Sequence, residues 1–409
     1  MDTRKAAALS VMEQLEKSGF QAYLVGGCVR DEMLGISPQD YDIATDAVPD
    51  QVQNLFPRTI PTGLKHGTVT VVEQGIPLEV TTFRIEEAYL DRRRPSQVRF
   101  VSSLKQDLAR RDFTINAMAK NRRGQVIDYF SGKEDLLVGR IRTVGNPRDR
   151  FREDALRMLR AVRFVAQFGF ALEEETRRAL IALRSECFHL SVERVVQELE
   201  KMWKAVSPSA GVRELFSTDL LRALPPFCRW DLQSFPPDQA ASFDHTSDRI
   251  VRWAYLLWLC QTDEACLGRR LKALKLPTRD QKQISVCFRL MLAGEWTATD
   301  PVYWKRQLLR HGLDSVRRSG QLRRLVGKIM DKDLTETRFQ DWWNEMPVKE
   351  RRELALGGEE LIRYSGKKAG PWVGQVLNNL YEQVALGLLP NDKNALLEEG
   401  YKIGKVDSQ

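Results

Sequence analysis

The spacing of hydrophobic positions changes about a third of the way along the chain. Before Gly139, short apolar runs such as residues 41–45 and 68–83 alternate with polar residues or end at turns, which is typical of strands. Helical spacing occurs at Leu9, Val11, Met12 and Leu15, in a helix that stops near Ser18-Gly19, and again over residues 103–120. After Gly139 only helical patterns follow. The sequence therefore predicts an α+β head followed by an all-helical remainder.

Two of these segments are predicted in more detail. Residues 68–83 form a hairpin that turns at Gln74-Gly75. Residues 153–169 form one strong amphipathic helix, which ends at Gly169 because glycine readily adopts the left-handed conformation that follows a helix.

Composition indicates a soluble globular protein. The chain has 409 residues, 43% hydrophobic and 29% charged, enough for several domains. No apolar run has the length of a membrane helix, and the N-terminal helix mixes acids with bases, unlike a signal peptide. The six cysteines form no CxxC pair. We expect a cytoplasmic protein with reduced thiols and no membrane partner.

The charge is distributed unevenly. The net charge of +8 is modest for this length. However, eight arginines and three acidic residues lie between Gly139 and Arg163. Arginine is favoured over lysine where planar anions or bases are bound, so this stretch suggests a nucleotide or nucleic-acid partner.

Two carboxylates alternate in the segment "QDYDIA". Asp40 and Asp42 would share one face if they lie in the same strand. They would repel each other unless a cation lay between them, and Mg²⁺ binds such carboxylates while keeping water or phosphate oxygens as ligands. Glu79, on a second predicted strand, is a candidate third acid. This set is typical of two-metal phosphoryl transfer.

A glycine turn precedes these carboxylates. In "VGGCVRD", Gly26 and Gly27 allow the backbone to approach a phosphate closely, and Arg30 follows at the start of a predicted helix. The turn and the carboxylates together predict a nucleoside triphosphate site with a magnesium ion nearby.

Three motifs carry a family resemblance. They are "LVGGCVRDEMLG" with "DYDIAT", then "LARRDFTINAMA", then "RFREDALRMLRAVRF". In this order they resemble the class II tRNA nucleotidyltransferases of bacteria, the CCA-adding enzymes, which are grouped with bacterial poly(A) polymerases in the polymerase-β-like superfamily. The resemblance is strong over about residues 20–200 and continues weakly through "GPWVGQVL".

The resemblance implies a fold and a reaction. The fold would be a polymerase-β-like head (1–138), a neck that recognises the base (139–200), a helical body (201–300) and a tRNA-binding tail (301–409), in a seahorse shape. The reaction would add C, C and A to the 3′ end of tRNA, in its acceptor arm, from CTP and ATP with Mg²⁺ and without a template. The oligomeric state is left open, a homodimer included.

The resemblance also implies residue roles. Asp40 and Asp42 would bind the metal ions and Glu79 would be the third catalytic carboxylate. The remaining candidates would contact the nucleotide: Gly27, Arg30 and Arg111 at the triphosphate, Asp112 and Asn116 near the sugar, and Asp154, Arg157, Arg160 and Arg163 in the neck. The helical pattern over residues 103–120 places Asp112 and Asn116 on one face.

Asp154 and Arg157 offer a physical basis for base selection. Three residues apart in a predicted helix, they would present an acceptor beside a fork of donors. Cytosine and adenine both pair with that edge, whereas uracil and guanine would leave buried groups unpaired, at about 1–3 kcal/mol per group. Glu153, four residues before Arg157, is positioned to support it.

Two other segments receive predictions. Residues 84–98 are polar and weakly periodic, which predicts a mobile loop. The family resemblance implies that this loop serves the change from C to A addition. Residues 189–201 resemble a neck-stabilising segment, with Ser191 as a helix cap.

Two alternatives remain open. The same catalytic motifs serve an A-adding enzyme or a poly(A) polymerase. A non-catalytic RNA-binding protein built on a polymerase-like head is the alternative from another class.

Overall fold

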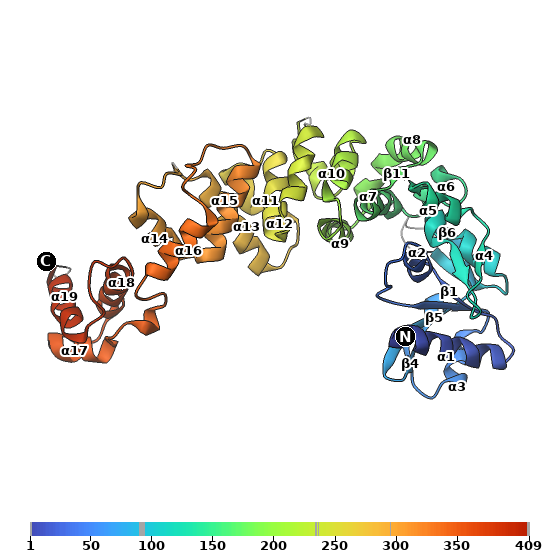
Figure 1. Cartoon of the computed structure of the whole chain (residues 1–409), viewed down its shortest axis with the longest axis horizontal. Coiled ribbons are helices and arrows are strands. Elements are labelled where there is room, and N and C mark those ends of the chain that lie inside the picture. The colour runs from blue at the N-terminus through green and yellow to red at the C-terminus, as the bar shows by residue number, and fades with distance from the viewer. Residues whose placement is uncertain (1, 90–94, 234, 236, 295, 407–409) are drawn as a thin grey trace. The chain divides into compact units, whose positions relative to one another are not determined.

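The computed structural model describes residues 2–89, 95–233, 235, 237–294 and 296–406. The chain divides into two compact units, Met1–Asp244 and His245–Gln409. Figure 1 shows the β-structure near the N-terminus and helices in the rest of the chain, as the hydrophobic pattern predicts. The finer division at residues 138, 200 and 300 stays a prediction.

Within the described residues, the head contains a seven-stranded sheet in the order β3-β4-β5-β2-β1-β8-β9. Neighbouring strands pair antiparallel except β2 and β5, which are parallel. The strands are β1 (Ala22–Val25), β2 (Asp42–Thr45), β3 (Thr59–Gly63), β4 (Thr68–Glu73), β5 (Ile76–Thr82), β8 (Met118–Lys120) and β9 (Val126–Asp128).

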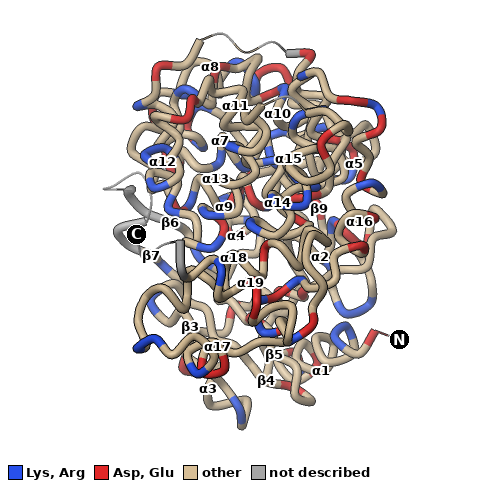
Figure 2. The backbone as a smooth tube through the Cα atoms, turned by 90° about the vertical axis from the view of Figure 1, so that its left-hand side faces the viewer, with Lys and Arg blue, Asp and Glu red and all other residues tan. Residues whose placement is uncertain are grey.

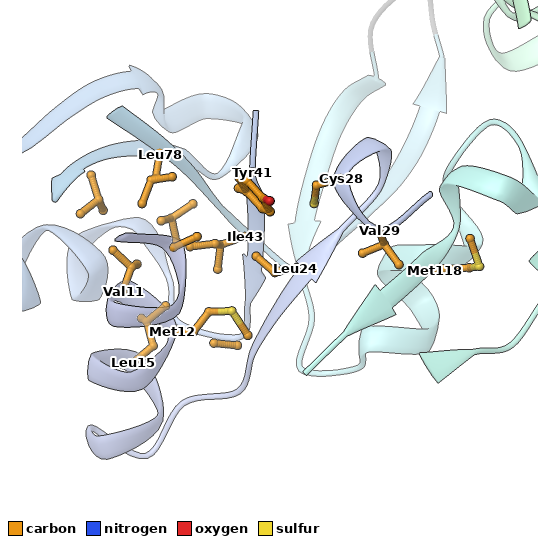
Figure 3. Close-up of a cluster of buried hydrophobic side chains, with 14 of the residues drawn as sticks. Val11, Met12, Leu15, Leu24, Cys28, Val29, Tyr41, Ile43, Leu78 and Met118 are labelled. Carbon is orange, nitrogen blue, oxygen red and sulfur yellow. The ribbon is translucent and has the colours of Figure 1, made fainter. Parts of the chain in front are cut away.

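One face of this sheet packs against the N-terminal helix. The helix α1 (Thr3–Lys17) begins at Asp2, whose side chain accepts a hydrogen bond from the backbone of Arg4. Figure 3 shows its apolar side chains beside those of the strands. Cluster members on the helix and strands include Val11, Met12, Leu15, Leu24, Ile43, Leu78 and Val80. The opposite face carries Asp42 together with a second apolar cluster, which includes Val25 and Ala44.

Short helices surround the sheet. They are α2 (Gly27–Met33), α3 (Pro49–Leu55), η1 (Leu64–His66), α4 (Leu104–Ala109), η2 (Thr114–Asn116) and α5 (Gly132–Leu137). The predicted helix over residues 103–120 is wrong, because it divides into α4, η2 and strand β8. An isolated bridge between Phe113 and Thr143 turns the chain at this point, a long-range contact that local periodicity does not contain.

Residues 84–98, predicted as a loop, lie mostly in two paired strands. The strands β6 (Arg84–Tyr89) and β7 (Pro95–Phe100) form an antiparallel ribbon, and residues 90–94 lie outside the described residues. Backbone hydrogen bonds define such a ribbon, so it does not require the hydrophobic alternation by which a sequence reveals a strand.

The rest of the first unit is almost wholly helical. The helices are α6 (Pro147–Glu153), α7 (Leu156–Phe168), α8 (Glu174–Leu183), η3 (Arg184–His189), α9 (Val192–Trp203), α10 (Pro208–Ser217), η4 (Leu221–Ala223), η5 (Phe227–Arg229) and η6 (Pro237–His245), with the strand pair β10 (Arg140–Ile141) and β11 (Ala171–Leu172). Gly169 ends α7 with a φ of 70°, as predicted. The predicted start is wrong, because Asp154 is extended and separates α6 from α7.

The second unit is helical, and its described residues include two apolar clusters. Its helices are α11 (Arg249–Leu259), α12 (Glu264–Ala273), α13 (Thr278–Leu292), α14 (Pro301–His311), α15 (Leu313–Leu325), α16 (Glu336–Glu345), η7 (Arg351–Glu353), α17 (Gly358–Ser365), α18 (Pro371–Ala385) and α19 (Lys393–Val406). One cluster contains Trp304 and Phe339, and the other contains Val376 and Leu380. In the described ranges no helix is long and apolar enough to cross a bilayer.

Candidate active site

Asp42 and Glu79 lie side by side on the sheet. They are register partners in the parallel pair β2–β5, and Glu79 is also the partner of Thr70 in β4. Residues paired in this way share a face, so both carboxylates project from the same side. Their neighbours Ile43 and Val80 project to the other side and are buried in the cluster beside α1. The fold thus brings together two acids that are 37 positions apart in the sequence.

Asp40 lies just before β2, so the prediction that Asp40 and Asp42 share a strand is wrong. Tyr41 between them explains the local geometry. Its side chain is 4% exposed, and its hydroxyl lies 3.4 Å from the carboxylates of both Asp2 and Glu32. This buried anchor fixes the segment, while Asp40 and Asp42 remain exposed.

The electrostatics of Asp42 are those of a site that lacks positive charge. The surrounding protein partly desolvates this carboxylate and so raises its pKa. The negative charges of Glu79 and Asp40 raise the pKa further, whereas the positive charge of Arg111 lowers it. Carboxylates that are held close together in spite of their mutual repulsion are suited to bind a divalent cation. No group of three or more His, Cys, Asp or Glu in the described part of the chain is arranged to hold a metal ion. A cation here would therefore need further oxygen ligands from water or substrate.

The glycine turn brings Arg111 next to these acids. Gly26 has a φ of 76°, and a Cβ atom at this position would lie 2.9 Å from Arg111 Nη1. Glycine is therefore favoured by the backbone conformation, and a larger residue would also displace the end of the Arg111 side chain. The Nε atom of Arg111 is buried and has no hydrogen-bond partner among the described residues. This cation retains a donor for an anionic ligand, and Gly27 begins α2 next to it.

Arg30 does not point into the open site. It is 6% exposed, and its Nη1 donates to Asn116 Oδ1 at 2.5 Å while its Nε donates to Asp31 at 2.8 Å. Its guanidinium also lies 4.7 Å from the ring centre of Phe168 in α7. In this conformation Arg30 joins α2 to Asn116 and to α7, and its contact with a triphosphate stays a prediction.

Asp112 and Asn116 meet, although not through a helix. Asn116 Nδ2 donates to Asp112 Oδ1 at 3.2 Å, and Arg160 Nε donates to Asp112 Oδ2 at 2.8 Å. Burial alone would raise the pKa of Asp112, but Arg160 and the Asn116 amide hold it at about 2. The pair therefore forms a fixed acidic centre between the head and α7.

Asp154 and Arg157 have separate partners. Asp154 accepts from the backbone N–H of Leu156 at 3.0 Å and from Arg194 in α9 at 2.9 Å. Arg157 donates to Glu153 at 2.6 Å, as predicted, and to the carbonyl of Arg110 at 3.1 Å. The placement of Asp154 and Arg157 on one helix face is wrong, because the extended backbone at Asp154 interrupts the helix. Each is nevertheless held in a fixed orientation.

Arg163 pairs with a carboxylate that sequence reasoning did not select. Glu198 in α9 is 4% exposed and lies 2.7 Å from Arg163 Nε. Burial lowers the pKa of Arg163 to about 10. The Phe164 ring has Arg163 at 4.1 Å and both Arg30 and Arg160 at 5.7 Å from its centre. Local spacing reveals only the part of this cluster on α7, since Arg30 comes from α2 and Glu198 from α9.

Asp107 is a second residue that sequence reasoning missed. It is 1% exposed and pairs with Arg110 at 2.8 Å and Arg111 at 3.3 Å. Here a signal existed, because an acid three and four residues before two arginines is a common helical ion-pair spacing.

Three segments of the chain match known protein families. Residues 22–142 match the family described as "Poly A polymerase head domain". Residues 169–230 match "Probable RNA and SrmB- binding site of polymerase A", and residues 244–399 match tRNA nucleotidyltransferase domain 2.

Relatives and solved structures cover nearly the whole chain. The CCA-adding enzyme of Bacillus velezensis is 40% identical over 97% of this chain and 98% of its own. That of Lactiplantibacillus plantarum is 38% identical over 96% and 95%. The crystal structure of the Bacillus stearothermophilus CCA-adding enzyme in complex with CTP matches with a TM-score of 0.84 and 34% identity, over 100% of this chain and 99% of that one. The Thermotoga maritima enzyme complexed with tRNA, at a TM-score of 0.66 and 21% identity over 98% and 96%, shares the fold. With its paired carboxylates, its glycine turn and these full-length relatives, the chain belongs to the family of CCA-adding enzymes, which are tRNA nucleotidyltransferases.

Proposed function

We propose that this enzyme adds C, C and A to the 3′ end of tRNA, using CTP and ATP without a nucleic-acid template and releasing pyrophosphate. The observation that supports this most strongly is the Asp42–Glu79 pair beside Arg111, in a chain that is 40% identical over 97% of its length to a CCA-adding enzyme. The relative solved with CTP points to the same class of substrate.

Magnesium fits the carboxylates of this site. Asp40 and Asp42 would hold it, with Glu79 beside them, because these exposed acids lie close enough for Asp40 and Glu79 to raise the pKa of Asp42. When bound, Mg²⁺ would supply activation of the terminal hydroxyl and neutralisation of the leaving pyrophosphate, as in two-metal phosphoryl transfer. The protein's own task is to position the substrates around it.

The triphosphate would lie against Gly27 and Arg111. The Arg111 side chain is partly exposed, its Nε has no hydrogen-bond partner among the described residues, and charge-assisted hydrogen bonds to phosphate are the strong ones. Asp112 and Asn116 would lie near the sugar. A contact between Arg30 and phosphate would require Arg30 to leave Asn116 and Asp31.

The base would be selected by Asp154 and Arg157. Each already has a partner that limits its movement, Arg194 for Asp154 and Glu153 for Arg157. A carboxylate can accept further hydrogen bonds, and a guanidinium can donate up to five. The same edge would pair with cytosine and adenine and leave groups unpaired beside uracil or guanine, with Arg160 and Arg163 supporting it from α7.

The second unit would bind tRNA. Its helix α15 carries Arg317, Arg318, Arg323 and Arg324. Figure 2 shows Lys and Arg interspersed with Asp and Glu along the backbone. Basic side chains on these helices would bind the RNA backbone by charge and by shape.

The test is the sequence of the product ends. Purified enzyme receives Mg²⁺, CTP and ATP with tRNA lacking its 3′ end, tRNA ending in C, and tRNA ending in CC. We expect all three to stop at CCA. Growth of A on the CC substrate alone would make this an A-adding enzyme, and long A tails on any RNA would make it a poly(A) polymerase. No incorporation would favour an RNA-binding protein.

A further inference from the structure

Asp107 lies between the two halves of the candidate site. Its carboxylate is 1% exposed and lies within α4. Oδ1 accepts from Arg110 Nε at 2.9 Å, Arg110 Nη2 at 2.8 Å and the backbone N–H of Arg84 at 3.3 Å, and Oδ2 accepts from Arg111 Nη2 at 3.3 Å. Burial opposes its ionisation, but Arg111 and Arg110 hold the pKa of Asp107 below its ordinary value. One buried negative charge thus holds two neighbouring arginines.

The ion pair between Asp107 and Arg111 connects Asp107 to the carboxylates of the site. Arg111, held by Asp107, lies against Gly26, where a Cβ atom would be 2.9 Å from its Nη1. Its charge lowers the pKa of Asp42, so the two groups are electrostatically coupled. The orientation of Arg111 therefore decides where a phosphate can lie relative to Asp42.

The ion pair between Asp107 and Arg110 connects Asp107 to Arg157. The side chain of Arg110 is bound to Asp107, and its carbonyl oxygen accepts from Arg157 Nη2 at 3.1 Å. Arg157 is 8% exposed and is also held by Glu153. A shift of the backbone at Arg110 would remove one of the contacts that aim Arg157.

We propose that Asp107 is a positioning residue that fixes the triphosphate contact at Arg111 and the base contact at Arg157 in one geometry. This rests on the proposed function. Asp107 touches no substrate. It acts because residues 110 and 111 are adjacent, so one carboxylate binds both of their side chains, while the carbonyl oxygen of Arg110 accepts from Arg157. Loss of its charge would affect nucleotide binding and base selection together.

The alternative is that Asp107 only stabilises the fold. A matched control separates the two roles. Asp135 is 0% exposed, accepts from Arg142 Nε at 2.9 Å and from Thr114 Oγ1 at 2.6 Å, and contacts neither Arg110 nor Arg111 in the described structure. Asp135→Asn should lower the melting temperature as Asp107→Asn does, but should leave nucleotide KM and base selection at wild-type values.

The experiment compares wild type, Asp107→Asn, Asp107→Glu and Asp135→Asn in the full chain. Single additions of CTP to tRNA lacking its 3′ end, and of ATP to tRNA ending in CC, give kcat and KM. The same reactions with UTP and GTP give the selection ratio. For Asp107→Asn we expect nucleotide KM to rise about tenfold and the ratio of kcat/KM for CTP over UTP to fall about tenfold, the effect of one misplaced polar contact.

The Asp107→Glu variant, the melting temperatures and the Asp135→Asn control decide whether Asp107 positions the site or only stabilises the fold. Asp107→Glu keeps the charge and should recover part of both losses, and it serves as the test if the Asn variant does not fold. A lower melting temperature with unchanged KM and selection in the folded Asp107 variants would overturn the inference, as would equal kinetic losses in Asp135→Asn. If wild type itself incorporates no nucleotide, it is the proposed function that fails.

Discussion

Single residues at this site carry charges that the fold holds together against their repulsion. Asp42 and Glu79 are register partners, and Asp42 has a raised pKa because the protein surrounds it and Glu79 lies beside it. Nearby, Asp107 and Asp112 have lowered pKa values because arginines outweigh their burial. Acids with arginine partners are stabilised in their charged form, whereas Asp42, with too little positive charge around it, is the one that we propose binds a cation.

Replacing Asp42 should separate activity from stability. In Asp42→Asn we expect nucleotide incorporation to fall on the order of a thousandfold, since a bound metal ion is worth several kcal/mol in such reactions. The melting temperature should stay level or rise, because repulsion with Glu79 is removed. Asp149→Asn, at an exposed position of α6, is the control. Full incorporation by Asp42→Asn would contradict the metal assignment.

The Asp112–Arg160 pair should give a pH-dependent contribution to stability. The pKa of Asp112 is about 2 in the fold against an ordinary value of 3.8. Its folded pKa is the lower one, so the charge stabilises the fold above about pH 4, and this contribution is lost as the pH falls towards 2. Urea unfolding of wild type and Asp112→Asn should differ by on the order of 2 kcal/mol at pH 7 and at pH 5. A difference that did not narrow below pH 4 would contradict the prediction.

The sequence revealed individual site residues better than their partners. Asp42, Glu79 and the Glu153–Arg157 pair could be predicted because motifs and short spacings contain them. The contact of Arg30 with Asn116 could not, because it joins residues 86 positions apart. Asp107 was within reach of local reasoning, since its arginines follow three and four positions later.

At the scale of elements, the interruptions between helices position the site residues more than the regular helices do. The extended backbone at Asp154 separates α6 from α7, and the 3₁₀ turn η2 replaces the predicted helix around Asn116. Both segments look helical in sequence because their apolar residues recur at suitable intervals. Neither segment forms one continuous helix, because tertiary contacts favour another backbone conformation. Among these contacts are the Phe113–Thr143 bridge and the Arg194–Asp154 ion pair.

Gly132 offers a test of the packing around η2. A Cβ atom at this position would lie 2.3 Å from the Thr114 carbonyl oxygen and 2.9 Å from Met118 Cγ. Because the nearest atom is backbone, Gly132→Ala should cost about 1–3 kcal/mol in urea unfolding. The control Gly268→Ala has open space in the helix α12 and should stabilise the protein by up to about 1 kcal/mol. Equal effects of the two substitutions would contradict this account.

The whole molecule consists of two compact units, and the candidate site lies entirely in the first. Residues up to Asp244 contain the sheet, the glycine turn and the helices α7 and α9 that hold the neck residues. The hydrophobic pattern predicted the change from mixed to helical structure. It did not locate the boundary at residue 244, because helices continue on both sides of it.

A fragment of residues 1–244 should therefore fold and bind nucleotide. Asp244 itself accepts from the backbone N–H of Ser209 at 3.0 Å, so this cut preserves a contact of the first unit. We expect a cooperative thermal transition by circular dichroism and a CTP affinity within about threefold of the full chain, with tRNA affinity lost because basic helices are removed. A fragment without a thermal transition would show that the first unit depends on the second.

The parallel pairing of β2 and β5 has a consequence for how the enzyme should lose activity on heating. The separation of Asp42 and Glu79 is set by a backbone ladder, in which four residue pairs are in register, and not by a loop. Such a ladder opens only when the sheet melts, whereas a loop loosens well below that temperature. Heat inactivation should therefore coincide with the loss of secondary structure instead of preceding it, so the enzyme would remain a competent catalyst until the sheet itself comes apart.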